Sequence, residues 1–167
     1  MPVEQILAKA EQLWHDKAVE FHIVGGCHPT AGLDYYCEML SALKKTYPDA
    51  HLQAFTAVEI DNIAQVNRIS VRETLTALRQ SGLGSLPGGG GEIFAPAIRS
   101  KICPEKISGK RYLEVMREAH QLDIPTNVTM LFGHLESEAD RVDHMLAIRD
   151  LQDETGGFNS FIPLLFH

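Results

Sequence analysis

The fold of this chain is decided at Phe21-His22-Ile23-Val24-Gly25-Gly26-Cys27-His28-Pro29. The first four of these residues form a short, mainly apolar run that is typical of a buried strand, and a glycine pair follows it directly. The same order, an apolar run, then a loop with small or ionisable residues and usually a helix, occurs four more times. We therefore expect five strands, at residues 21–24, 52–55, 83–86, 128–132 and 161–165.

Helical patterns fall between these strands. Ser70 and Glu73 have the spacing of a capping box, and the helix that they start is expected to end at Gly82. Asp34 and Ser137 are candidate N-caps of two other helices. Apolar residues at helical spacing are Val3, Ile6, Leu7, Ala10, Leu13 and Trp14, then Tyr36, Met39, Leu40 and Leu43, then Tyr112, Val115, Met116 and Ala119, and finally Val142, Met145, Leu146 and Leu151.

The alternation of strands and helices predicts an α/β fold with a parallel sheet and right-handed crossovers. It fits either an open doubly wound sheet or an arc of a (β/α) barrel, of which a complete example has about 250 residues and eight strands. Because the expected order begins with a helix and ends with a strand, we interpret residues 1–167 as a single partial barrel domain cut from a larger fold. Its open edges and apolar surface would make it poorly soluble when expressed alone.

Composition excludes several classes of partner. The formal net charge is −7 and the Lys and Arg residues form no cluster, so nucleic acid and anionic membranes are not expected ligands. No apolar stretch approaches the roughly 20 residues that a membrane span requires. Residues 1–14 contain acids and do not resemble a signal peptide, so the expected location is the cytoplasm.

Candidate site residues follow the strands, where parallel sheets bind their ligands. Gly25 and Gly26 can bring backbone groups against an amino acid or a phosphate. Residues 87–91 contain four glycines but lack the GK[ST] sequence of a P-loop, and Glu92 could accept hydrogen bonds from ribose hydroxyls. The remaining candidates are Glu59, Gly133, His134 and Glu136, together with His28 and His167.

These residues leave two classes of enzyme open. One is a metal-dependent hydrolase that uses His28, His134, Glu136 and His167 as zinc ligands, although no HxH or HExxH spacing is present. The other holds a nucleoside-like cofactor on glycine-rich strand ends and needs no metal site of its own. Cys27, Cys37 and Cys103 have no zinc-ligand spacing and are expected to be reduced thiols.

Several strings resemble the radical S-adenosylmethionine (SAM) enzymes of the futalosine route to menaquinone. They are His22–Gly26 with His28-Pro29, Ala54–Ile60, Ser85–Gly90, Glu92–Phe94, Ile102–Pro104, Thr129–His134, Gln152–Phe158 and Phe161–Leu164. The resemblance covers essentially the whole chain. Phe94, Cys103, Asn127 and the ending Pro163-Leu164 are more similar to the aminofutalosine synthase branch than to the dehypoxanthine futalosine cyclase branch.

The resemblance implies a radical-SAM barrel of which this chain supplies the second to sixth strand–helix units. In that family a CxxxCxxC loop after the first strand binds a [4Fe-4S] cluster, and an external electron donor reduces it. The cluster then cleaves SAM to a 5′-deoxyadenosyl radical, which adds to the enol ether 3-[(1-carboxyvinyl)oxy]benzoate with loss of carbon dioxide. The CxxxCxxC loop is absent from this sequence. The alternatives are therefore an incomplete synthase, a piece of the cyclase, or a SAM-binding remnant without catalysis.

The resemblance also implies roles for individual residues. Gly25 and Gly26 match the motif that contacts the methionine part of SAM, with Cys27 where the family often has Glu. Gly133 and Glu136 match a motif near the adenine. The resemblance further implies that Glu59 and Glu92 bind ribose or substrate, and that His28 and His134 meet substrate carboxylates or transfer protons.

Overall fold

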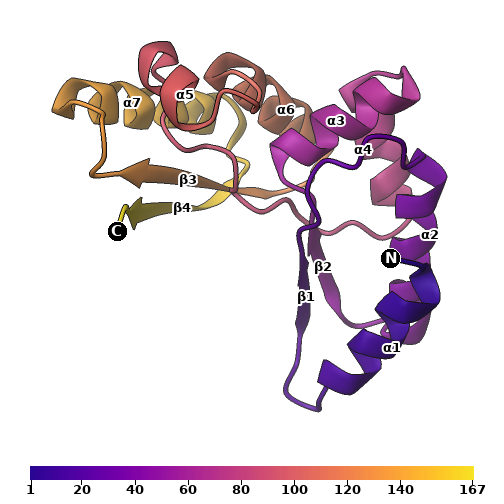
Figure 1. Cartoon of the computed structure of the whole chain (residues 1–167). Coiled ribbons are helices and arrows are strands. Elements are labelled where there is room, and N and C mark those ends of the chain that lie inside the picture. Colours follow the sequence, from indigo (N-terminus) through magenta and orange to yellow (C-terminus); the bar gives the residue numbers. More distant parts are fainter.

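The computed structural model describes all 167 residues as an α/β fold (Figure 1). The strands are β1 (Glu20–Ile23), β2 (His51–Ala54), β3 (Thr126–Phe132) and β4 (Phe158–Leu165). The helices are α1 (Val3–Leu13), α2 (Leu33–Thr46), α3 (Ala57–Asn67), α4 (Val71–Gln80), α5 (Pro96–Ile102), α6 (Gly109–Gln121) and α7 (Glu138–Thr155).

All strand pairs are parallel, as predicted. β1 pairs with β2 and β3 pairs with β4, so the structure contains two small sheets rather than a barrel. The strand expected at residues 83–86 is reduced to two parallel bridges, one from Ser85 to Gln53 and one from Leu86 to Thr126. Pro87 follows at once and has no N–H to donate, which explains why this segment pairs so briefly. The two bridges nevertheless place residues 85–86 between β2 and β3.

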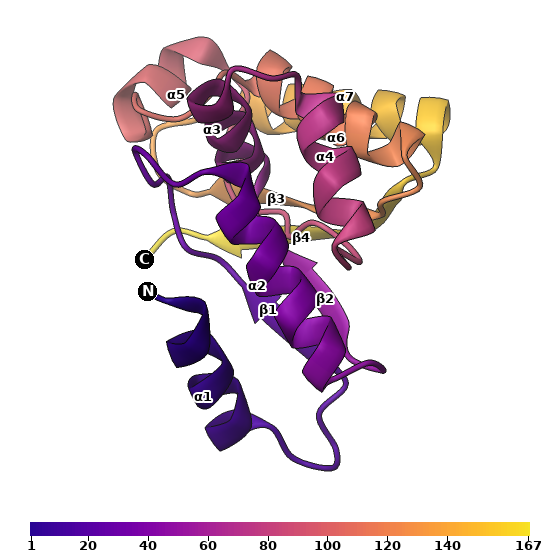
Figure 2. The ribbon, with the colours of Figure 1, turned by 90° about the vertical axis from the view of Figure 1, so that its right-hand side faces the viewer.

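The helices cover one side of the strands. Figure 1 shows α5, α6 and α7 over β3 and β4, and Figure 2 shows α2 across β1 and β2. The covered side is lined by a single cluster of 26 buried apolar residues, which includes Leu40, Leu52, Ile60, Met116 and Val128. The strands alternate accordingly, since Phe21 and Ile23 of β1 pack against this cluster while its other two residues are exposed.

Two details of the first helices differ from the prediction. Leu13, expected on the inner face of α1, has 76% of its surface exposed, and only Val3 and Ala10 of this helix are buried. Asp34 is not the N-cap of α2, because the helix begins one residue earlier and Gly32 occupies the cap position. The Leu33 N–H is instead satisfied by the Asn67 side chain at 2.9 Å, an acceptor that local sequence does not reveal.

The caps of the later helices agree with the prediction. Ser70 and Glu73 form the expected capping box of α4, and Ser137 caps α7. The expected face of α7 is only partly right: Leu151 is buried, but Val142, Met145 and Leu146 are exposed. α3 and α5 were not predicted. Two helices, α3 and α4, therefore lie between β2 and the bridge at Ser85, and two more, α5 and α6, lie between Leu86 and β3. None of the helices is both long and apolar enough to cross a membrane.

Candidate functional site

The glycine pair after β1 is fastened to the start of α3. The N–H groups of Gly25 and Gly26 both donate to Oε1 of Glu59, at 2.8 and 2.9 Å. Gly26 has a φ of 81°, a backbone region that glycine adopts without strain. The carbonyl oxygens of Gly25 and Gly26 accept no hydrogen bond from the chain, so they are the free polar groups of this loop.

Glu59 holds both sides of this contact. It is the third residue of α3 and forms a capping box with Thr56. Its second oxygen, Oε2, accepts from the Thr56 N–H and the Thr56 hydroxyl, each at 2.9 Å. The buried carboxylate therefore accepts four hydrogen bonds from the protein, and its evident task is to position the Gly25-Gly26 loop.

The two residues after this loop, Cys27 and His28, differ in the reactive group that they can offer a ligand. The ring of exposed His28 accepts the N–H groups of Thr30 and Ala31 at Nδ1, and its Nε2 has no partner in the chain. Partial desolvation raises the pKa of the Cys27 thiol, and the charges of Glu59 and Asp61 raise it further. The Cys27 thiol is therefore protonated at neutral pH, whereas the His28 ring presents a free nitrogen.

The glycines at 88–91 are required by close packing. A Cβ on Gly88 would lie 2.8 Å from the Val128 backbone, and one on Gly91 would overlap the Thr129 carbonyl oxygen. A Cβ on Gly90 would lie 2.5 Å from Cγ2 of Val58. This loop, predicted to be either a ligand cradle or a flexible connector, is therefore wedged between β3 and α3.

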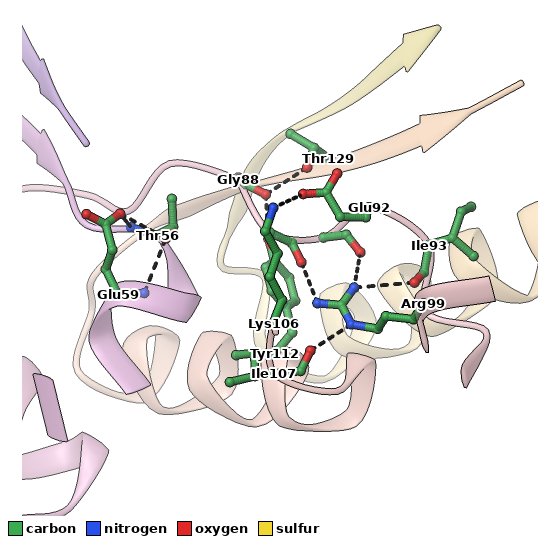
Figure 3. Close-up of polar contacts among 12 residues, drawn as sticks. Thr56, Glu59, Gly88, Glu92, Ile93, Arg99, Lys106, Ile107, Tyr112 and Thr129 are labelled. Atoms are coloured by element: carbon green, nitrogen blue, oxygen red, sulfur yellow. Dashed lines mark hydrogen bonds and ion pairs between the residues drawn. The ribbon is translucent and has the colours of Figure 1, made fainter. Parts of the chain in front are cut away.

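Buried donors hold the same loop by its carbonyl oxygens (Figure 3). Arg99 has only 4% of its surface exposed and donates from its guanidinium to Gly90, Gly91 and Ile93, at 2.8, 2.8 and 3.3 Å. The Gly88 carbonyl accepts the hydroxyl groups of Tyr112 and Thr129, each at 2.8 Å. Burial raises the pKa of Tyr112 well above its ordinary range, so its hydroxyl stays a donor at neutral pH.

Glu92 lies at the end of this loop. Its side chain is 18% exposed and its Oε1 pairs with Nζ of Lys106 at 2.8 Å. Its φ of 43° is unusual for a residue that is not glycine, and such strain gathers at functional sites. Glu92 is thus a partly accessible carboxylate on a constrained backbone.

The Gly133–Glu136 loop after β3 is organised around a second buried carboxylate. Glu136 accepts from the N–H groups of Gly133 and His134 at 2.5 and 2.9 Å and from Arg141 at 2.7 Å. Burial, the largest single influence, would raise its pKa. The opposing hydrogen bonds from the backbone and from Arg141 together lower the pKa of Glu136 to about 2. Glu136 is therefore ionised throughout the physiological range.

Both ring nitrogens of His134 are engaged within the same loop. Nε2 lies 3.0 Å from the Leu131 carbonyl, to which it donates, and Nδ1 accepts the Leu135 N–H at 2.7 Å. Nδ1 also lies 3.1 Å from Glu136. The side chain is 6% exposed, so the geometry favours a positioning role over proton transfer.

A chain of polar side chains crosses the sheet and was not predicted. Gln53 donates to Glu20 at 2.9 Å, Asn127 donates to Gln53 at 2.8 Å, and Ser160 donates to Asn127 at 2.8 Å. This chain of hydrogen bonds links all four strands. Its residues lie within strand patterns that show no unusual feature in the sequence. Only the three-dimensional register brings them together.

The strand-end segments meet along one edge of the structure. Gly25 and Gly26 contact Glu59, while Thr56 and Val58 flank Gly89 and Gly90. The Glu92 carbonyl accepts the Leu131 N–H at 2.9 Å, and the Gly133 loop follows two residues later. Thr56, Arg99, Lys106 and Tyr112 were missed, although the Thr56-x-x-Glu59 spacing was a readable capping-box signal.

The metal-site alternative finds no matching cluster. No group of three or more His, Cys, Asp or Glu side chains lies close enough together to hold a metal ion. The zinc set of His28, His134, Glu136 and His167 is therefore not assembled in this structure. Cys27 is exposed, Cys37 is half-buried and Cys103 is buried, and they do not form a cluster site either.

The comparisons define the class of protein. The sequence profile of the Radical SAM superfamily matches residues 1–148, so the chain belongs to this superfamily. It is 45% identical to the aminodeoxyfutalosine synthase of Thermus thermophilus over 98% of this chain and 44% of the relative. It is also 40% identical to a 5-amino-6-(D-ribitylamino)uracil–L-tyrosine 4-hydroxyphenyl transferase of Methanosarcina acetivorans, over 99% of this chain and 44% of that relative.

The second kind of relative is not confined to one organism. The corresponding transferase of Methanothermobacter thermautotrophicus is 39% identical over 99% of this chain and 45% of its own length. The chain thus spans less than half the length of the curated relatives that it matches. Membership of an enzyme superfamily is shown, whereas the particular reaction is a proposal.

Proposed function

We propose that this chain is the SAM-binding part of an aminodeoxyfutalosine synthase that acts in menaquinone biosynthesis. The whole enzyme would join the 5′-deoxyadenosyl group of SAM to 3-[(1-carboxyvinyl)oxy]benzoate with loss of carbon dioxide. The observation that carries the proposal is the contact between the segments that follow β1, β2 and residues 85–86, with the Gly25-Gly26 loop fastened by Glu59. The 45% identity to the Thermus thermophilus enzyme supports the choice of reaction.

The residues of this chain would bind and orient the reactants. SAM supplies the 5′-deoxyadenosyl group when it is bound. The free carbonyl oxygens of Gly25 and Gly26 suit its ammonium group, and the Gly133 loop, which Glu136 organises, suits its adenine. We assign Glu92 to ribose or substrate.

The roles of the remaining candidates follow from their environments. Glu59 acts through the loop that it holds, because its four hydrogen bonds leave it little capacity for a ligand. His28 remains the candidate for contact with a substrate carboxylate or for proton transfer, since its Nε2 is free. His134 positions the loop around Glu136.

The [4Fe-4S] cluster of the family does not fit the cysteines of this chain, which do not lie together. We assign it to a CxxxCxxC segment of the whole protein, which also receives the external electron donor. We further propose that residues 1–167 form the second to sixth units of a partial radical-SAM barrel. The parallel order β1, β2, residues 85–86, β3 and β4 supports this arrangement.

The experiment is an anaerobic assay of the whole protein with its cluster reconstituted. With SAM and the enol ether we expect aminofutalosine and carbon dioxide. Parallel reactions should contain dehypoxanthine futalosine, or tyrosine with 5-amino-6-(D-ribitylamino)uracil. Turnover in one of those reactions, without turnover of the enol ether, would replace the synthase by the cyclase or by the archaeal type of transferase. SAM binding without turnover of any substrate would leave a non-catalytic remnant.

A further inference from the structure

In the backbone of residues 88–93, most carbonyl oxygens accept hydrogen bonds from the protein, whereas the N–H groups do not donate any. The carbonyls of Gly88, Gly90, Gly91 and Ile93 accept from Tyr112, Thr129 and Arg99, and that of Glu92 accepts from the Leu131 N–H. Every one of these carbonyls is therefore turned toward a protein donor, and Figure 3 shows this for Gly88 and Ile93.

The N–H groups of the same segment have no such partners. Those of Gly89, Gly90, Gly91, Glu92 and Ile93 donate to no backbone or side-chain acceptor in the chain. Gly90, Gly91 and Ile93 are buried, and buried N–H groups in proteins are nearly always paired. Five neighbouring donors without an acceptor indicate a group that the protein itself does not supply.

The φ angles of this segment alternate in sign, as they do in anion-binding nests. Gly90 and Glu92 have positive φ values of 89° and 43°, while Gly89 and Gly91 between and before them do not. Such alternation turns successive N–H groups toward a common point, where they bind an anionic oxygen. The packing that forbids a Cβ on Gly90 and Gly91 fixes this conformation.

The charges behind the loop favour an anion. Arg99 is buried and pairs with carbonyl oxygens only, so no carboxylate in the chain neutralises it. Lys106 pairs with Glu92 at 2.8 Å, so the charge of this lysine is matched by a carboxylate while that of Arg99 is not. A buried, unneutralised guanidinium strengthens hydrogen bonds from neighbouring N–H groups to a negative ligand.

We infer that the N–H groups of residues 89–93 bind a carboxylate of a small-molecule ligand. This inference rests on the proposed function, in which SAM and the enol ether both carry carboxylates and neither carries a phosphate. The shared chemistry is a carboxylate held by backbone donors, with Arg99 as the positioning residue that keeps the carbonyl oxygens turned away.

The test is hydrogen–deuterium exchange of the whole protein, read on peptides that cover residues 86–94. SAM, 5′-methylthioadenosine (which lacks the carboxylate), the enol ether and benzoate are added separately, each at saturation. Residues 89–93 are expected to exchange about tenfold or more slowly when the carboxylate is bound, because exchange then requires its release. The control segment is residues 150–157, in which the Gly156 N–H donates to the Gln152 carbonyl oxygen.

Each result decides between the sources. Slowing by SAM but not by 5′-methylthioadenosine assigns the nest to SAM, and slowing by the enol ether alone assigns it to the substrate. If calorimetry shows that both ligands bind and residues 89–93 exchange unchanged, the nest is refuted while the proposed function stands. If neither ligand binds, the proposed function fails. The nest is then tested by benzoate alone: slower exchange of residues 89–93 with benzoate supports the nest, and unchanged exchange overturns it.

A variant provides a second readout. Arg99→Lys keeps the positive charge but has three donors without the planar fork that reaches the four carbonyls of Gly90, Gly91, Ile93 and Ile107. We therefore expect the ligand-induced slowing at 89–93 to need about tenfold more ligand. Arg72→Lys is the matched control, because Arg72 is an exposed arginine paired with Glu118 on the helical surface. Equal ligand dependence in both variants would remove Arg99 from the positioning role.

Discussion

Glu59→Gln tests the most specific contact of the site. Both oxygens of Glu59 are occupied, Oε1 by Gly25 and Gly26 and Oε2 by Thr56. A glutamine amide has one acceptor oxygen and one donor nitrogen, so one of these pairs must be lost and two donors then face an NH₂ group. Hydrogen bonds to a charged group contribute about 1.5–3 kcal/mol each, so losing the pair should lower the free energy of unfolding by about 3 kcal/mol or more.

Glu73→Gln is a matched control within the same chain. Glu73 is also the third residue of a capping box, but it uses only Oε2, toward the N–H and hydroxyl of Ser70 at 2.8 and 2.7 Å. A glutamine can keep its carbonyl oxygen in that position and turn its NH₂ group to solvent. We expect this substitution to cost below about 1 kcal/mol.

The assay combines urea denaturation with hydrogen–deuterium exchange of the whole protein. Glu59→Gln should speed exchange at Gly25 and Gly26 and weaken SAM binding, whereas Glu73→Gln should change neither. If the two variants lose equal stability and exchange at Gly25 and Gly26 stays as in the unmodified protein, the proposed fastening by Glu59 is wrong.

Three further predictions concern charge and surface. Burial, with a smaller effect of Arg117, lowers the pKa of His120 to about 4, and the unfolded chain should therefore bind an extra proton between the usual value of 6.5 and 4. The contribution of His120 to stability should be complete above pH 6.5, fall by up to about 3 kcal/mol down to pH 4 and level off below, and a His120→Gln variant whose pH profile matches the unmodified protein would contradict this. Glu92→Gln breaks a half-exposed ion pair worth about 1 kcal/mol or less, so ligand affinity measured by calorimetry should fall more than the melting temperature suggests; unchanged affinity with lower stability would reject a site role. Leu164→Lys on β4, where Leu164 is 47% exposed, should reduce self-association of the isolated 167-residue chain in light scattering, and equal association would show that β4 is not the adhesive surface.

The sequence predicts the strands because each is a short apolar run between helical patterns. β2 and β3 begin one or two residues before their expected positions, and β4 begins three residues before. The segment at 83–86 was over-predicted, since apolar character alone cannot reveal that Pro87 and the packing of Gly88 against Val128 end its pairing. Strand existence is thus a local property, but pairing length is not.

The sequence places the candidate residues at strand ends but does not predict the contacts that each of them makes. Spacing identified Glu59, Glu92 and Glu136 as strand-end acids, yet only the structure separates them. Glu59 and Glu136 accept hydrogen bonds from their own loops, whereas Glu92 pairs with Lys106 and stays partly accessible. The role of Arg99 could not be predicted from the sequence, because its partners are backbone carbonyl oxygens, which every residue has.

The most direct test of the central claim is a crystal structure of the whole enzyme with SAM bound. We predict the amino acid part of SAM against the carbonyl oxygens of Gly25 and Gly26, and its adenine beside the Gly133–Glu136 loop. SAM bound elsewhere, with both loops free of ligand, would contradict the assignment of this edge as the cofactor site.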